Sequence, residues 1–287
     1  MKLSEKTKGI LFIICSATCF ACMTMSVRLA GDLPTMEKAL FRNLIAGIVV
    51  AIPFMRGHEK VSFPAGSFKY VLARAICGTI GLCLNFYAVD KLNLADSNIL
   101  NKLSPLFAVL FSAVILREKV KPVQIGLILL AILGAALVIK PGGTAVPAVP
   151  AICGFISGVA AGMAYACLRK ARLAGASGPL IVLFFSAFTV VVVLPFVFAN
   201  FVMPTLRQFL FLLLCGFFGA GGQLFITAAY SHAPAREISI YDYSQVLVAA
   251  LLGYFVFGQI PDLLSFAGYI IIIGSAFLNF RYSKKQA

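Results

Sequence analysis

Long apolar stretches alternate with short polar segments along the whole chain. A helix needs roughly 20 apolar residues to cross ~30 Å of hydrocarbon. Such stretches predict ten membrane-spanning helices. In the first half they cover residues 9–30, 34–55, 68–89, 94–116 and 122–139, and in the second half residues 151–171, 178–199, 206–230, 235–257 and 262–280. We therefore expect an all-α membrane protein with ten transmembrane helices.

The second half of the chain repeats the first. Matching residues recur in the two halves. Gly78-x-x-Gly81 recurs as Gly219-x-x-Gly222, and the same register pairs Ala88 with Ala229 and Asp96 with Glu237. Arg28-Leu29-Ala30-Gly31 recurs as Arg172-Leu173-Ala174-Gly175. Each copy holds an odd number of spans, so the second copy must enter the bilayer upside down. We expect a first five-helix repeat over residues 1–140, a linker rich in proline and glycine over 141–150, and a second repeat over 151–287. Inverted repeats surround a central site in many secondary transporters.

The composition agrees with a location in lipid. Hydrophobic residues make up 61% of the 287 residues, charged residues only 12%, and the mean hydropathy is +0.99. A soluble domain is nearer half apolar. The net charge of +14 does not indicate a nucleic-acid partner, because the basic residues lie in short clusters between apolar stretches. Gly154, Gly158 and Gly162 recur every four residues in the sixth span, a stripe typical of close helix packing in lipid.

The basic residues also predict the orientation. Of the 24 Lys and Arg residues, 16 fall in one set of loops and five in the opposite set, namely Arg28, Lys38, Lys91, Lys140 and Arg207. Cytoplasmic loops carry the excess of positive charge, so both termini are expected in the cytoplasm. We read the apolar run after Lys8 as a retained span, because it exceeds the usual core of a signal peptide. The expected location is a bacterial inner membrane.

Three cations remain inside predicted spans: Arg42, Arg74 and Lys102. A charge at the bilayer centre costs at least ~2.5–3.5 kcal/mol. Arg42 and Lys102 each lie eight residues into a span that starts at the outer face, so both should lie about 12 Å deep. Two cations at one depth repel each other unless an anion separates them. A substrate, a protein carboxylate or both could supply that anion.

The strongest protein carboxylate is Asp242. In the repeat register Asp242 matches Asn101 and Tyr243 matches Lys102, as expected for a central site at the interface of the repeats. Pro105 can kink the fourth span beside Ser104. The candidate substrate-binding residues are therefore Arg42, Asn101, Lys102, Ser104, Tyr241, Asp242, Tyr243 and Gln245. Asp242 is also the candidate coupling residue, because burial raises the pKa of a carboxylate.

Each of these residues has a purely structural alternative. Arg74 could extend to the cytoplasmic interface, Arg42 could pair with Glu37 or with a helix C-terminus, and Lys102 and Asp242 could form a structural ion pair. Cys15, Cys19 and Cys22 share one face of the first span but have no His or carboxylate neighbour, so we expect no metal site. No catalytic constellation, nucleotide-binding loop or cofactor motif stands out.

Several segments resemble the EamA branch of the drug/metabolite transporter superfamily. They are Phe41-Arg42-Asn43, Arg117-Glu118 followed by Pro122, Gly126 and Gly134, and Phe255-Val256-Phe257-Gly258-Gln259 followed by Gly268 and Gly274. Gln259 stands where that family usually has Glu. The stretch around Tyr241-Asp242-Tyr243 resembles the subgroup that contains S-adenosylmethionine transporters. The resemblance implies a central cavity with alternating access and no ATP. It also places the fifth and tenth spans at the periphery, where they could support a homodimer.

These observations predict a secondary-active transporter for a small anionic or zwitterionic metabolite. An amino-acid-like solute would use both signs of charge, and the subgroup adds S-adenosylmethionine as a candidate. Expected partners are the metabolite, the lipid bilayer, and a proton or counter-solute. The main alternative is an exporter of cationic drugs or polyamines by proton antiport at Asp242. A channel and a membrane-embedded enzyme are further alternatives.

Overall fold

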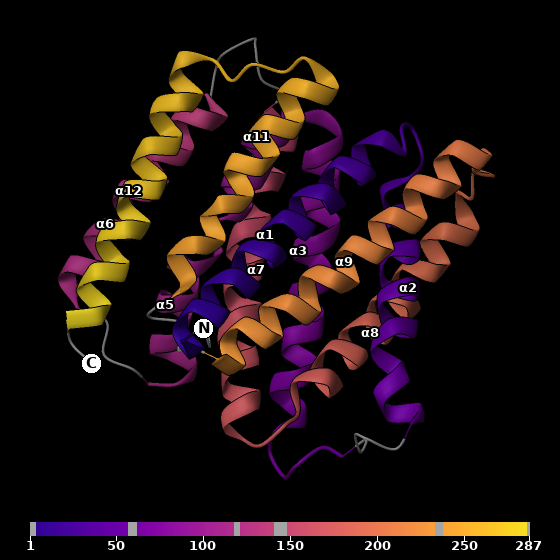
Figure 1. The fold of residues 1–287 in the computed structure, drawn as a ribbon, viewed down its shortest axis with the longest axis horizontal. Helices are drawn as coiled ribbons and strands as arrows, with labels where there is room; N and C mark the ends of the chain where they lie inside the picture. Colours follow the sequence, from indigo (N-terminus) through magenta and orange to yellow (C-terminus); the bar gives the residue numbers. More distant parts are fainter. Residues whose placement is uncertain (1–3, 57–61, 118–120, 141–147, 233–237, 286–287) are drawn as a thin grey trace.

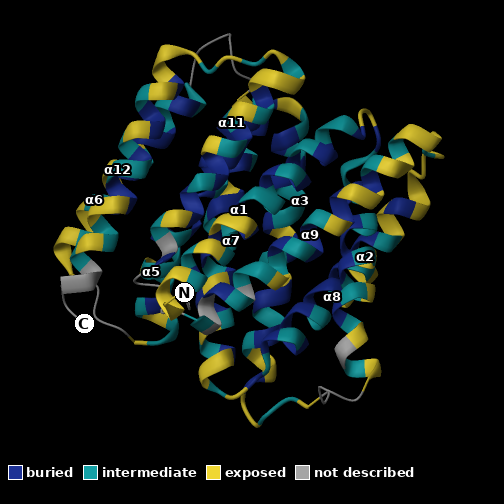
Figure 2. Ribbon diagram, in the orientation of Figure 1, coloured by how far each residue is buried: buried dark blue, intermediate teal, exposed yellow. Residues whose placement is uncertain are grey.

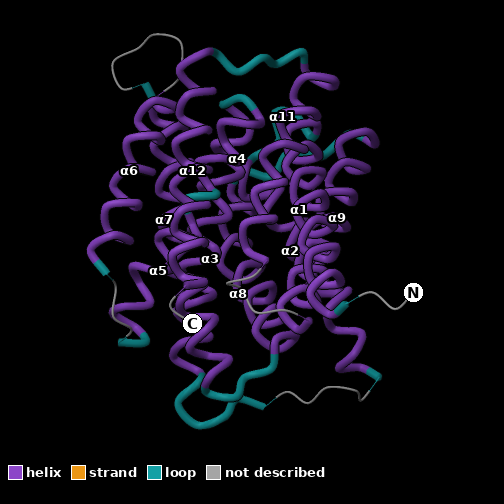
Figure 3. The backbone as a smooth tube through the Cα atoms, turned by 60° about the vertical axis from the view of Figure 1, so that its left-hand side comes forward, coloured by secondary structure: helices purple, strands orange, loops and turns teal. Residues whose placement is uncertain are grey.

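The computed structural model describes residues 4–56, 62–117, 121–140, 148–232 and 238–285. Within these residues all regular structure is helical, and the loops lie mainly at the two ends of the bundle (Figure 3). The helices of the first half are α1 (Glu5–Leu29), α2 (Thr35–Met55), α3 (Phe68–Lys91), α4 (Leu94–Asn101), α5 (Ser104–Ile115) and α6 (Pro122–Ile139). Those of the second half are α7 (Ala148–Leu173), α8 (Gly178–Ala199), α9 (Leu206–His232), η1 (Ser239–Tyr243), α11 (Ser244–Phe257) and α12 (Leu263–Lys285).

The outer surface of the bundle is apolar. Within the described residues, nine helical segments are long and apolar enough to cross a membrane, with α4 and α5 counted as one. Large apolar side chains on this surface are open, including Val114 at 78%, Phe198 at 78% and Phe255 at 77% exposure. Figure 2 shows exposed positions along the outward faces of α6 and α12. An exposed apolar surface this extensive is typical of helices that face lipid.

The helix α2 is not among these nine segments. It is 21 residues long and carries Glu37, Lys38 and Arg42 in its first half. The side chains of all three are buried in the bundle rather than presented to the surroundings. The polar residues of α2 are therefore accommodated by its neighbours.

The ends of several helices differ from the prediction by up to five residues, as at α1 and α12, and three further differences matter for the architecture. The fourth predicted span is interrupted between α4 and α5, and the described part of the ninth begins with the 3₁₀ turn η1. The helix α7 begins at Ala148, which lies inside the predicted linker 141–150. Residues 141–147 lie outside the described residues, as does Glu237, the predicted counterpart of Asp96.

Helices from the two halves pack against each other in a regular pattern. The helix α1 packs along α9, and α3 packs along α7, so that the first span meets the eighth and the third meets the sixth. These two pairings are equivalent under the sequence repeat. The helices α2 and α8 form another pair, and α6 and α12 lie side by side at one edge of the bundle (Figure 1). The core is therefore built jointly by both halves.

The glycine stripe on α7 lets this helix approach α4 and α5 closely. A Cβ atom at Gly158 would lie 2.5 Å from the carbonyl oxygen of Leu100, and one at Gly162 would lie 2.6 Å from the Cβ of Phe107. Such distances are too short for any side chain. The close packing predicted from the spacing of the glycines is thus confirmed.

We expect the substitution Gly158→Ala to destabilise the protein, because its new methyl group would collide with rigid backbone. Overpacking of this kind typically costs about 1–3 kcal/mol. The control is Gly126→Ala in α6, where an added Cβ meets nothing within 4 Å. Thermal unfolding in detergent can be followed with a thiol-reactive dye as the buried Cys167 and Cys215 become accessible. Equal melting temperatures for the two variants would contradict the assigned packing.

Candidate functional site

The interruption of the fourth span lies at residues 102 and 103. The amide of Leu106 donates to the carbonyl of Leu103 at 3.0 Å, a tighter turn than an α-helix makes. Pro105 lies in the first turn of α5, where its missing N–H group costs little. The hydroxyl of Tyr243 donates to the carbonyl of Lys102 at 2.8 Å. A side chain from the second half thereby satisfies a backbone group at the break in the first half.

A buried ion pair joins the same two places. The Nζ atom of Lys102 lies 2.5 Å from Oδ2 of Asp242, and the two side chains are 7% and 9% exposed. Asp242 belongs to η1, directly before α11, so the pair links the interrupted span of the first half to the 3₁₀ turn at the start of α11 in the second half. The second carboxylate oxygen of Asp242, Oδ1, is buried and has no hydrogen-bond partner in the described residues.

Amide side chains extend this polar centre to further helices. The Nε2 atom of Gln245 donates to Oδ1 of Asn98 at 2.5 Å, and Nδ2 of Asn98 donates to the hydroxyl of Thr24 at 3.2 Å. The Nδ2 atom of Asn101 donates to the hydroxyl of Ser157 at 3.1 Å. These bonds connect α4 with α1, α7 and α11, so the polar centre joins four helices from both halves.

Two arginines form a second cluster beside the first. Arg42 on α2 and Arg74 on α3 are 2% and 6% exposed. Their guanidinium carbons lie 5.6 Å and 4.2 Å from the centroid of the Phe185 ring on α8. Arg42 donates from Nη1 to Oδ1 of Asn43 at 2.7 Å, and the Nε atoms of both arginines have no partner in the described residues.

Tyr165 on α7 interacts with both the arginine cluster and the ion pair. Its hydroxyl interacts electrostatically with Asp242, Arg74 and Arg42, which lie on three different elements. Although these groups are buried, Tyr165 is 39% exposed. Tyr165 lies within electrostatic range of both the arginine cluster and the ion pair.

Polar contacts join the helix ends at one end of the bundle. Lys38, fully buried, donates to Oδ1 of Asp90 and to the carbonyl of Gly31, both at 2.7 Å. Arg28 donates to the carbonyl of Leu92, and Oε1 of Gln259 accepts from the amide of Leu94 at 2.9 Å. These bonds tie together α1, α2, α3 and the start of α4, and they connect α4 to the residue that follows α11 and Gly258.

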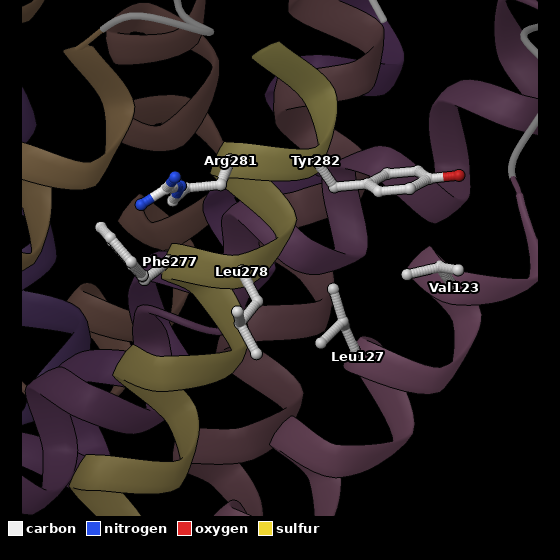
Figure 4. A pocket seen from close by; sticks show the side chains of 6 residues that line it. All are labelled: Val123, Leu127, Phe277, Leu278, Arg281 and Tyr282. Atoms are coloured by element: carbon white, nitrogen blue, oxygen red, sulfur yellow. The ribbon is translucent and has the colours of Figure 1, made fainter. Parts of the chain in front are cut away.

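A separate pocket lies at the edge of the bundle between α6 and α12. Its lining consists of Val123, Leu127, Phe277, Leu278, Arg281 and Tyr282 (Figure 4). Most of these side chains are apolar, and none belongs to the ion pair or to the arginine cluster. The pocket therefore offers no grouping of charges comparable with that at the centre of the bundle.

The comparison with known protein families identifies the chain. The model of the EamA-like transporter family matches residues 7–140 and again residues 149–281. The chain belongs to the EamA-like transporter family. It is thus a member of the drug/metabolite transporter superfamily and an integral membrane protein, as the resemblance predicted.

Several relatives of this EamA-like chain are similar over nearly its whole length. The pseudopaline exporter CntI of Pseudomonas aeruginosa (strain UCBPP-PA14) is 31% identical over 275 residues, which cover 95% of this chain and 96% of the relative. An S-adenosylmethionine uptake transporter of Rickettsia felis is 25% identical over 266 residues, covering 92% and 88%. A solved crystal structure with 17% identity superposes with a TM-score of 0.67 over 98% of this chain and 99% of the other, which shows a shared fold.

The EamA-like bundle brings together most of the predicted site residues. Lys102, Asp242 and Tyr243 are in direct contact, while Asn101 and Gln245 join the surrounding amide network. Ser104 is buried at the start of α5. Two predicted residues lie elsewhere: Arg42 belongs to the arginine cluster, and Tyr241 is 40% exposed.

The prediction of the site missed three residues. Arg74 was weighed as a residue that could extend to the interface, yet it is buried over Phe185. Its position four residues before Gly78, in the repeated glycine motif, is a signal that could have revealed its place. Phe185 and Tyr165 carry no such signal, because the chain holds 26 Phe and nine Tyr residues and only the fold selects among them.

We expect Lys102→Met to destabilise the EamA-like bundle strongly, because Asp242 would lose its buried partner. Breaking a buried ion pair typically costs about 3–5 kcal/mol. The matched control is Lys140→Met, because Lys140 pairs with Asp262, which is 51% exposed. That pair, with the amide of Ser265, holds the pKa of Asp262 below its usual range, but exposed pairs contribute only about 0–1 kcal/mol. Thermal unfolding in detergent measures the stability of both variants. Similar decreases in their melting temperatures would contradict a larger contribution of the buried pair to stability.

Proposed function

We propose that this protein is a secondary-active transporter that moves a small anionic or zwitterionic metabolite by alternating access. One observation carries the proposal: the interrupted fourth span and the 3₁₀ turn before α11 meet at the buried Lys102–Asp242 pair. A binding site between two repeats is the arrangement that allows each half to move against the other around a bound solute. The pairing of α1 with α9 and of α3 with α7 supports a symmetric arrangement of the halves.

The proposal includes the finer architecture expected from the sequence. With α2 as a spanning helix, the nine apolar segments become ten, arranged as two inverted five-helix repeats over residues 1–140 and 151–287. Both termini would be cytoplasmic, in a bacterial inner membrane. The end joined by the contacts of Lys38, Arg28 and Gln259 would then be the outer face, and the described state is proposed to be closed toward the outside.

An amino-acid-like solute is the proposed substrate class. The ion pair supplies a carboxylate oxygen without a partner, and the arginine cluster supplies positive charge nearby. A zwitterion can use both. That Lys102 and Arg42 jointly bind an anionic group of the substrate stays a prediction from the sequence. In the structure Lys102 contacts Asp242. The relatives named as pseudopaline exporter and S-adenosylmethionine uptake transporter support a metabolite substrate. A proton or counter-solute and a homodimer remain part of the proposal.

The second candidate is export of cationic drugs or polyamines by proton antiport. The unpartnered Oδ1 atom of Asp242 favours it, because a buried carboxylate can exchange a proton for a cationic solute. The two buried arginines speak against it, since they would repel a cation that enters the same space.

Counterflow in proteoliposomes tests the proposed transport. We expect labelled S-adenosylmethionine or L-glutamate to accumulate in liposomes preloaded with the same unlabelled solute, with a saturable rate. Asp242→Asn should lower this rate about tenfold or more, the effect of losing ~1.4 kcal/mol of interaction. Lys140→Met should leave the rate unchanged, because its ion pair with Asp262 lies at the edge of the bundle.

Other outcomes would point to the alternatives. A flux that does not saturate would indicate a channel. Accumulation of labelled spermidine alone, driven by a pH gradient and lost in Asp242→Asn, would indicate the cation exporter. The first result would overturn alternating access, and the second would overturn the proposed substrate class.

A further inference from the structure

Four cations are buried among the described residues: Lys38, Arg42, Arg74 and Lys102. Two of them have carboxylate partners, since Lys38 pairs with Asp90 and Lys102 pairs with Asp242. Arg42 and Arg74 differ, because neither has a carboxylate within 4 Å among the described residues, although both are buried. An unpaired buried charge is costly, and two such charges side by side are more so. The protein alone does not neutralise this pair.

The repeated glycines make room for these two side chains. A Cβ atom at Gly78 would lie 2.2 Å from Nη1 of Arg74, and one at Gly219 would lie 3.0 Å from Nε of Arg42. Gly78 and Gly219 occupy the same position in the two halves of the sequence. Each half therefore provides one glycine against which one arginine side chain packs. A side chain at either glycine position would occupy the space of that arginine.

Both guanidinium groups converge on one ring. They lie over Phe185, and the positive charges of Arg42 and Arg74 act on each other. The Nε–H groups of both are without a partner. An arginine uses its planar set of N–H donors to bind a carboxylate through two parallel hydrogen bonds. One Nη1 donor of Arg42 is used by Asn43, and the remaining donors of the two guanidinium groups are available to an anionic group.

Asp242 supplies a negative group within electrostatic range of Tyr165. The hydroxyl of Tyr165 interacts with both arginines and with Asp242, whose Oδ1 atom has no partner. Two positive groups and one available carboxylate oxygen therefore lie within electrostatic range of the same tyrosine hydroxyl. An ammonium group would satisfy that oxygen, while two carboxylates would satisfy the arginines.

We infer that Arg42 and Arg74 form a substrate subsite for a solute with two carboxylates, with Asp242 receiving the ammonium group of an acidic amino acid. This inference rests on the proposed transport and specifies its substrate class. Each carboxylate binds one guanidinium group over Phe185. Tyr165 interacts with the arginines and with Asp242 and positions the solute. A neutral amino acid satisfies only one arginine and binds more weakly.

Ligand-induced thermal shift on the full chain in detergent tests the subsite. The probes are L-glutamate, glutarate, which lacks the ammonium group, and L-alanine, which lacks the second carboxylate. A ligand that binds only the folded state raises the melting temperature. We expect L-glutamate and glutarate to stabilise the protein at concentrations at least about tenfold lower than L-alanine. No shift with either dicarboxylate would overturn the inference.

Substitutions separate the roles of the arginines and of Asp242. Arg74→Gln and Arg42→Gln should each weaken the binding of L-glutamate and of glutarate about tenfold or more, because a charge-assisted contact is lost. Asp242→Asn should weaken L-glutamate and leave glutarate unchanged. The control is Arg207→Gln, because Arg207 also stacks over a phenylalanine ring, that of Phe211 at 5.8 Å, but is exposed. Equal affinities in Arg74→Gln and in the control would overturn the subsite.

Stability distinguishes binding from a structural role of the arginines. Without ligand, Arg74→Gln should melt at the same or a higher temperature than the unchanged protein, because it removes one of two mutually repelling charges. A lower melting temperature would indicate a structural role and overturn the inference. Gly78→Ala supplies a second variant that keeps the charge but displaces the flexible end of Arg74. This variant should also bind glutarate more weakly, and an unchanged affinity for glutarate would count against the subsite.

The counterflow measurement keeps the two proposals separate. Glutarate binding that depends on Arg74, without any counterflow, would uphold the subsite and overturn the carrier. Saturable counterflow of another solute that is insensitive to Arg74→Gln would uphold the carrier and overturn the subsite.

Discussion

A charge in hydrocarbon has to find its partner inside the protein, because lipid tails offer none. In this bundle that constraint determines which helices meet. Lys38 joins α2 to α3 through Asp90, and Lys102 joins the interrupted fourth span to the ninth through Asp242. Tyr269 on α12 donates to the buried carboxylate of Asp96 on α4 at 2.5 Å. The polar residues thus fix the arrangement of helices whose apolar surfaces alone would not distinguish one neighbour from another.

The same constraint applies to the backbone. A break in a spanning helix leaves carbonyl and amide groups without their usual partners, so breaks persist only where other groups satisfy them. The break at Lys102 meets this condition through the hydroxyl of Tyr243 and through the tight turn that leads into α5. Irregular backbone, buried charge and an aromatic donor consequently gather at one place. The proposed alternating access requires a centre that holds the halves together and can rearrange, and we expect it here.

Hydropathy predicted the helical class and most of the helix boundaries, because apolar length is a direct requirement of the bilayer. The register of the repeat also predicted that Asn101-Lys102 and Asp242-Tyr243 belong to one site. The position of a charged residue along its span was less informative about whether its side chain is buried and what it contacts. Lys38 was counted with the loop residues and Arg74 was weighed as reaching the interface, yet both are buried. Rotation of a helix decides such outcomes, and it depends on contacts with α7, α8 and α9 that a single sequence does not encode locally. Tyr241 illustrates the same limit, since it is open while its neighbour Asp242 is buried.

The ion pair at the centre is made from residues that are not copies of each other. In the repeat register Lys102 corresponds to Tyr243, and Asp242 corresponds to Asn101. Two identical copies of the first half would place Asn-Lys opposite Asn-Lys, and two copies of the second would place Asp-Tyr opposite Asp-Tyr. Neither arrangement contains an opposite charge. The pair can therefore form only between two halves that differ, so neither half could take the place of the other without leaving a buried charge unpaired.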